Sequence, residues 1–150
     1  MINVSLEWNE KMQFEGSTDS NEHRVLLDSS LSDVGGEGKG VTPKHLFLHS
    51  IAGCTAMDVI HILSRMRADL PDRFAIQVQG EIADEDPKVF TDIELVYIVE
   101  GNVDRNKLSR AVKMSQETYC ALSIMVKRIT AFTYRVMLNG DEILSESNSE

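Results

Sequence analysis

One stretch of the chain, from Thr42 to Met66, limits what the remaining residues can fold into. Thr42 can cap a helix, and Pro43 suits the first helical position. No proline or turn dipeptide follows until Leu70-Pro71, so the stretch predicts a helix of about 24 residues and about 36 Å. A helix that is apolar on all sides is buried on all sides, so we expect the rest of the chain to wrap it. The apolar residues of this helix, which lie on all its sides, are Leu46, Phe47, Leu48, Ile51, Ala52, Met57, Val59, Ile60, Ile62 and Leu63.

The size and charge of the chain exclude several classes of protein. Its 150 residues fit a single domain, 1–150, with a substantial core. A net charge of -9 disfavours nucleic acid and anionic membranes as partners. The start lacks the apolar core of a signal peptide, and no apolar run reaches the roughly 18 residues of a membrane span. Two cysteines and seven methionines do not suggest a secreted disulfide scaffold. We therefore expect a cytoplasmic protein.

The residues before the helix predict an antiparallel meander. Ile2, Val4, Leu6 and Trp8 share one face of a half-buried strand, and strands at 11–16 and 24–28 follow it. The loop at 29–41 contains the segment GEGKG, which invites comparison with a phosphate-binding loop. The comparison fails because a glycine follows the lysine, where a magnesium-binding Ser or Thr is needed. We predict a flexible loop without a nucleotide site.

The residues after the helix predict a hairpin and a second helix. Residues 74–79 alternate between apolar and polar, and a longer alternating run at 89–100 follows a polar turn, so the two predict a hairpin. Asp104 can cap an amphipathic helix that extends to about Thr118. An apolar segment at 121–126 then forms either a third short helix or a continuation of the second.

The C-terminal part predicts one more strand and a tight turn. The strand covers 132–138, and Asn139-Gly140 is a strong signal for a two-residue turn. Residues 143–144 predict a brief return of the chain, and 145–150 a frayed end.

Cys54 and Cys120 are 66 residues apart, so the sequence contains no local CxxC redox motif or zinc pair. Two interpretations stay open at this point. If the fold or a dimer brings the thiols together, one thiolate can attack a substrate and the other can resolve the product as a disulfide. If not, both are small hydrophobic residues of the core.

The histidines and acids near Cys54 do not predict a metal or cofactor site. His45 and His49 have helical i, i+4 spacing without an HExxH pattern, so we interpret them as ordinary helix residues. His61 lies about 10 Å along the helix axis from Cys54, which is too far for a direct ion pair. Asp58, one turn from Cys54, would disfavour the thiolate, and we expect it to pair with a cation from elsewhere.

The helix carries the pattern PxxLFxxSxxGCTxxD from Pro43 to Asp58, and SxxxYC ends at Cys120 near the end of the second helix. These two patterns, in this order of elements, resemble the OsmC/Ohr family of osmotically inducible and organic-hydroperoxide-resistance proteins. The agreement covers nearly the whole chain.

The resemblance implies an α+β fold in which antiparallel sheets wrap long central helices in an intertwined homodimer. It also implies that Cys54 is the peroxidatic thiol and Cys120 the resolving thiol, in a pocket at the subunit interface. The expected function is thiol-dependent reduction of a small organic hydroperoxide, with an external dithiol as reductant and no cofactor.

The sequence departs from the family's peroxidase branch at two activating positions. A glutamate is expected after the helix-opening Pro43, where this chain has Lys44. An arginine is expected in the N-terminal meander, but the turn after Phe14 contains none, and Arg24 does not match the position. The chain thus resembles a branch that has both cysteines without this pair. The alternative function is a non-catalytic, dimeric, stress-linked binding protein, or a redox sensor, with a small-molecule pocket at the subunit interface.

Overall fold

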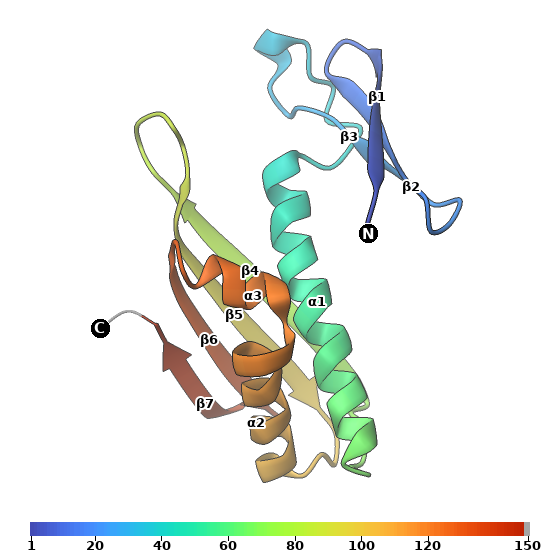
Figure 1. Ribbon diagram of the computed structural model, residues 1–150. Helices are drawn as coiled ribbons and strands as arrows, with labels where there is room; N and C mark the ends of the chain where they lie inside the picture. The colour runs from blue at the N-terminus through green and yellow to red at the C-terminus, as the bar shows by residue number, and fades with distance from the viewer. Residues whose placement is uncertain (149–150) are drawn as a thin grey trace. The chain divides into compact units, whose positions relative to one another are not determined.

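The structure is a computed structural model that describes residues 1–148 (Figure 1). The chain is α+β, as the sequence predicts. It divides into two compact units, Met1–Phe47 and Leu48–Glu150, and each is described by itself. The single domain expected from chain length stays a prediction.

The N-terminal unit contains the predicted antiparallel meander. Strands β1 (Val4–Glu10), β2 (Gln13–Thr18) and β3 (Arg24–Leu27) form one sheet in the order β1-β2-β3. Every residue of β1 is exposed in this chain, including Trp8 at 65 %, although its alternation predicted a half-buried strand. The three strands form a single layer, and a sheet needs a second layer to bury its apolar face.

A buried carboxylate holds the glycine-rich loop that follows β3 and contains the short 3-10 helix η1 (Ser32–Val34). Asp28 is 2 % exposed and accepts hydrogen bonds from the backbone N–H groups of Glu37 (3.3 Å) and Lys39 (3.0 Å). These N–H groups are the ones that a phosphate-binding loop would aim at its ligand. In this structure they bind Asp28 instead, and the predicted lack of a nucleotide site stays a prediction.

Helix α1 (Pro43–Arg65) matches the predicted helix closely, and Thr42 Oγ1 accepts a hydrogen bond from His45 N at its start. Its buried residues nevertheless form one stripe: Ile51, Thr55, Val59, Ile62 and Leu63. Met57, on the opposite side, is 70 % exposed, so a single chain does not supply the all-round burial that we expected. By length and composition α1 could cross a membrane, contrary to the sequence expectation, but a core helix of a soluble protein has the same properties.

The C-terminal unit is a four-stranded sheet with helices on one face (Figure 1). Its strands β4 (Arg73–Ile82), β5 (Phe90–Glu100), β6 (Ala131–Leu138) and β7 (Asp141–Ser147) lie in the order β4-β5-β6-β7. The predicted hairpin is β4–β5, whereas β5 and β6 are parallel, so this sheet is mixed. Strand β7 is longer than the predicted return and includes residues expected to fray, because it pairs along β6. Residues 149–150 of the predicted frayed end lie outside the described residues.

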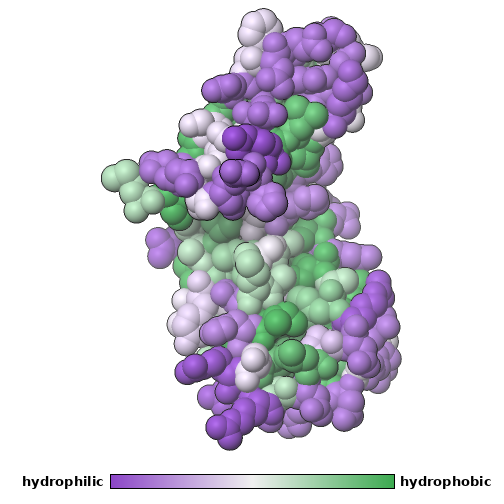
Figure 2. Space-filling model, turned by 90° about the vertical axis from the view of Figure 1, so that its right-hand side faces the viewer, coloured by the Kyte–Doolittle hydropathy of each residue, from purple (hydrophilic) through white to green (hydrophobic). Residues whose placement is uncertain are grey.

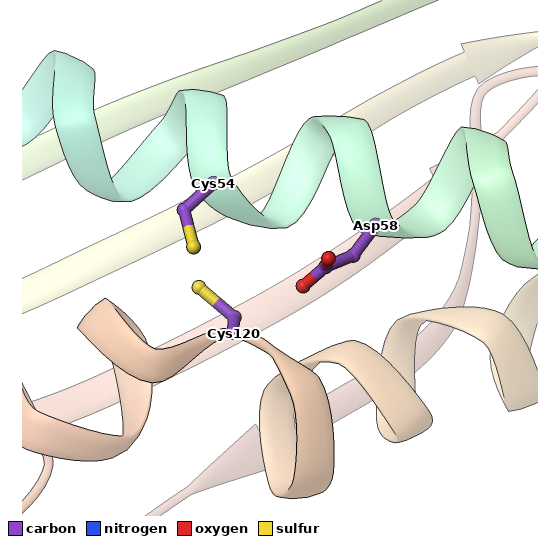
Figure 3. A group of neighbouring side chains, drawn as sticks. All are labelled: Cys54, Asp58 and Cys120. Carbon is purple, nitrogen blue, oxygen red and sulfur yellow. The ribbon is translucent and has the colours of Figure 1, made fainter. Parts of the chain in front are cut away.

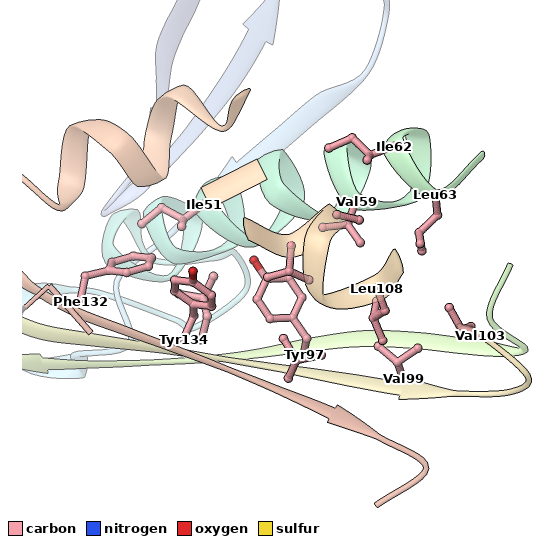
Figure 4. Packing of buried hydrophobic residues seen from close by; sticks show 14 of the residues in the cluster. Ile51, Val59, Ile62, Leu63, Tyr97, Val99, Val103, Leu108, Phe132 and Tyr134 are labelled. Carbon is pink, nitrogen blue, oxygen red and sulfur yellow. The ribbon is translucent and has the colours of Figure 1, made fainter. Parts of the chain in front are cut away.

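The core lies between this sheet and the helices (Figure 4). Alternate residues of β5 and β6 point inward, which is the two-residue period of a half-buried strand. Helix α2 (Arg105–Met114) begins at Asp104, whose side chain accepts from Lys107 N as predicted. The residues contributed by β5 and β6 are Ile93, Leu95, Tyr97, Val99, Phe132, Tyr134 and Val136.

Candidate functional site

Cys54 lies in the middle of α1, beside the buried stripe, and is half-buried. Asp58 follows one helical turn later and is also half-buried. Because residues four apart lie on the same side of a helix, both side chains leave α1 in the same direction (Figure 3).

A break in the second helix places Cys120. After α2, the chain forms one π-helical turn, η2 (Ser115–Tyr119), and then leaves helical geometry at Cys120 before α3 (Ala121–Val126). The Cys120 N–H closes the turn on the Ser115 carbonyl at 2.8 Å. A π-helical turn adds a residue to the helix and is frequent at functional sites. The sequence analysis left open whether 121–126 continued the second helix, and the structure shows a separate helix.

Cys120 is fully buried and caps α3, its Sγ accepting a hydrogen bond from Ser123 N at 3.4 Å. Burial raises the pKa of the Cys120 thiol to about 11, a hydrogen bond with Cys54 adds to this, and the bonds with Ser123 oppose it. Cys120 is therefore protonated at neutral pH.

The fold of one chain brings these three side chains together. The sulfurs of Cys54 and Cys120 and a carboxylate oxygen of Asp58 all lie within 4.8 Å of one another (Figure 3). Asp58 accepts a hydrogen bond from Ser115 Oγ at 3.1 Å, where the sequence analysis expected a cation. The two thiols are close enough that a small movement would join them as a disulfide.

A buried polar network lies next to the thiols, and sequence reasoning missed it. Thr55 Oγ1 is 2.6 Å from the Tyr97 hydroxyl and 2.8 Å from Ser115 Oγ, and Gln116 Nε2 donates to the Tyr97 hydroxyl at 2.7 Å. Burial raises the pKa of Tyr97, so its hydroxyl stays neutral. One feature of the sequence could have indicated this network: Thr55 is a hydroxyl residue that lies among apolar residues on the buried side of the helix.

Lys127 is a second residue that sequence reasoning missed. Its Nζ donates to the Gln116 carbonyl at 2.9 Å and lies over the rings of Phe132 and Tyr134. Burial lowers the pKa of Lys127. The ammonium group thus holds the carbonyl of the π-helical turn that leads to Cys120.

A cavity of about 480 Å³ opens beside Asp58. Its walls combine positive side chains with apolar ones, so it suits a small molecule that has a polar group and an apolar body. His61, two turns along α1 from Cys54, lines this cavity. It does not belong to the group of side chains around the two thiols, which is Cys54, Asp58 and Cys120. The lining residues are Asp58, His61, Ile62, Arg65, Met66, Arg110, Met114 and Tyr119.

The fold and the site together define an α+β protein with two nearby thiols, one on α1 and one just before α3. Residues 36–135 match the family of OsmC-like proteins, and the chain belongs to this family.

Known relatives agree with this assignment. Protein YhfA of Escherichia coli K12 is 32 % identical over 134 residues, which cover 89 % of this chain and 95 % of that protein. A crystal structure of a hypothetical protein from Aquifex aeolicus has 30 % identity, a TM-score of 0.79, and covers 93 % of this chain and 96 % of its own. An organic hydroperoxide resistance protein from Legionella pneumophila shares the fold with a TM-score of 0.65 and 15 % identity, covering 92 % and 96 %.

Proposed function

We propose that this protein reduces small organic hydroperoxides, with Cys54 as the attacking thiol and Cys120 as the resolving thiol. The observation that supports this most directly is the distance of at most 4.8 Å between the two sulfurs, combined with their unequal exposure. Cys54 is partly accessible and can meet a substrate, whereas Cys120 is buried behind it. Membership of the OsmC-like family is consistent with redox chemistry at such a pair.

The proposed reaction has three balanced steps. The Cys54 thiol gives up its proton, and the thiolate attacks the terminal oxygen of the peroxide. The O–O bond breaks, and the alkoxide takes up that one proton and leaves as the alcohol, so Cys54 becomes a sulfenic acid. Cys120 then attacks the oxidised sulfur, a disulfide forms, and water leaves. An external dithiol reduces this disulfide by exchange and becomes a disulfide itself.

The cavity beside Asp58 supports an organic substrate over hydrogen peroxide. Ile62 and Met114 offer apolar surface, and Arg65 and Arg110 offer positive charge on the same walls. An apolar substrate body gains from burial there.

A homodimer is part of the proposal, because proteins of this family are typically dimeric. Hydrophobic residues gather on the face of the C-terminal unit shown in Figure 2, and Met57 of α1 is 70 % exposed. A second chain that covered this side of α1 would give the helix the all-round burial that its sequence predicts. The cytoplasmic location stays a prediction.

The second candidate is a binding protein or redox sensor in which the thiols do not turn over. The cavity volume of about 480 Å³ is consistent with it, because ligand pockets typically measure about 300–1,000 Å³. Such a pocket can bind a small molecule without any reaction at the thiols. The buried, protonated Cys120 also disfavours fast thiol chemistry.

A turnover assay separates the two candidates. Reduced protein is mixed with cumene hydroperoxide and a dithiol, and with hydrogen peroxide as comparison. We expect faster consumption of the organic peroxide, no turnover for Cys54→Ser, and a single oxidation with a trapped sulfenic acid for Cys120→Ser. Ser64→Ala, at an exposed position of α1, serves as the matched control. Equal slow rates for all four proteins would favour the binding protein.

A further inference from the structure

Three side chains with metal-binding atoms converge at the thiol pair. Cys54 and Asp58 leave α1 on one side, and Cys120 approaches from the start of α3 (Figure 3). We propose that Cys54, Cys120 and Asp58 form a binding site for Zn²⁺, with the fourth position open to water. The proposal does not rest on the proposed peroxidase function, because it needs only reduced thiols.

The distances between the donor atoms fit a site that closes on an ion. Zinc binds thiolate sulfur at about 2.3 Å and carboxylate oxygen at about 2.0–2.2 Å, which puts the donors of a tetrahedral site about 3.4–3.8 Å apart. The three atoms here are at most 4.8 Å apart. A side-chain movement of about 1 Å therefore completes the site without moving a helix.

The type of donor selects the ion. Two thiolates and one carboxylate form a mixed soft and hard set that suits zinc, whereas magnesium and calcium require oxygen donors throughout. Each thiol releases its proton to solvent as zinc binds, and the 2+ charge of the ion offsets most of the negative charge that the two thiolates and Asp58 would otherwise hold together.

Hydrogen bonds behind the donors hold them in place. Ser115 Oγ donates to Asp58 Oδ2 at 3.1 Å, and Ser123 N donates to Cys120 Sγ at 3.4 Å. Partners of this kind orient metal ligands and tune their charge. Asp58 also lines the cavity of about 480 Å³, so this cavity reaches one edge of the proposed site.

Zinc at this site would block the thiols. With both sulfurs bound to the ion, neither can attack a peroxide or join the other as a disulfide. Zinc and oxidant would therefore compete for one site, and the metal-bound form would be the oxidation-resistant state of the protein.

The test measures metal binding on the full-length reduced protein without peroxide. Wild type is incubated with Zn²⁺, desalted and assayed for zinc, and its affinity is measured against a chromophoric chelator. We expect one ion per chain, loss of binding in Cys54→Ser, and at least a 10-fold weaker affinity in Asp58→Asn. Asp84→Asn, in the exposed turn between β4 and β5, makes the same charge change and should bind as wild type does.

Two further readouts protect the test against misfolded variants. Wild type loaded with Co²⁺ should show a thiolate-to-cobalt charge-transfer band and the strong visible bands of a tetrahedral ion. Zinc should also slow alkylation of both cysteines in wild type, as read by peptide mass spectrometry. An octahedral cobalt spectrum, binding that persists without Cys54, or equal affinity in Asp58→Asn and wild type would each overturn the proposal.

Discussion

The hydroxyl groups of Thr55 and Tyr97 lie 2.6 Å apart in the interior of the C-terminal unit. Thr55 comes from the same helix as Cys54 and is its next neighbour in the chain, and Tyr97 comes from the middle of β5. Gln116 Nε2 donates to both hydroxyls, at 3.2 and 2.7 Å. This contact fixes the rotation of α1 over the sheet, and with it the direction in which Cys54 points.

Removal of the tyrosine hydroxyl should cost stability. Tyr97→Phe keeps the ring but takes one partner from Thr55 and Gln116, and a buried polar group that loses its partner costs about 1–3 kcal/mol. We expect a loss of this size in the free energy of unfolding from urea titration. Thr91→Val, which removes a hydroxyl at an exposed position of β5, should change it by less than about 0.5 kcal/mol. Equal effects would show that the buried network contributes little.

The exposed apolar side of α1 predicts a dimer interface, and a charged residue introduced there should weaken the dimer. Wild type at micromolar concentration should sediment at about twice the chain mass of 16.8 kDa. Met57→Glu should shift the species toward monomer, because the charge would enter an apolar interface, while single-chain packing at this 70 % exposed position barely changes. Val89→Glu, 55 % exposed and before β5, is the control. A monomeric wild type would contradict the dimer.

The two thiols should differ in reactivity. Burial raises the pKa of Cys120 to about 11, so this thiol stays protonated at pH 8, and the residue is fully buried. In reduced, chelator-treated wild type, iodoacetamide should label Cys54 at least about 10-fold faster than Cys120. Peptide mass spectrometry over a time course gives both rates. Faster labelling of Cys120 would reverse the proposed roles.

Glu146 should make the free energy of unfolding fall as the pH becomes acidic. Lys113 and the Tyr134 hydroxyl bind its carboxylate, and the pKa of Glu146 is lowered by these hydrogen bonds and by the charges of Lys113 and Lys127. A carboxyl whose pKa falls on folding stabilises the protein above its ordinary pKa of about 4.5, and this contribution is lost as pH falls through the lowered value.

The variant Glu146→Gln tests this sign. It should be less stable than wild type at pH 7, by about 0.5–1 kcal/mol for a partly exposed ion pair, and the difference should shrink below about pH 4. Denaturant titrations at several pH values measure it. Glu85→Gln, on the exposed turn after β4, makes the same charge change without these partners. A difference that stays constant with pH would contradict the assignment.

Local periodicity in the sequence was enough to predict the elements. The 3.6-residue and two-residue patterns, the Thr42 and Asp104 caps and the Asn139-Gly140 turn are signals between near neighbours, and the structure confirms α1, the N-terminal meander and the β4–β5 hairpin. The family followed from patterns around the two cysteines. Burial was harder: Met57 reads as a core residue in the sequence but is exposed in one chain, because burial depends on what packs against a helix.

The resemblance to the family implied that Cys54 and Cys120 act together, but only the tertiary structure placed Cys120 beside both Cys54 and Asp58. The spacing of 66 residues between the two cysteines does not by itself give a distance in space. The proximity depends on the π-helical turn that ends α2 at Ser115 and on the packing of α1 beside it. Both are set by contacts between elements that are distant in sequence, such as the hydrogen bond from Ser115 to Asp58, so they form only when the whole unit packs.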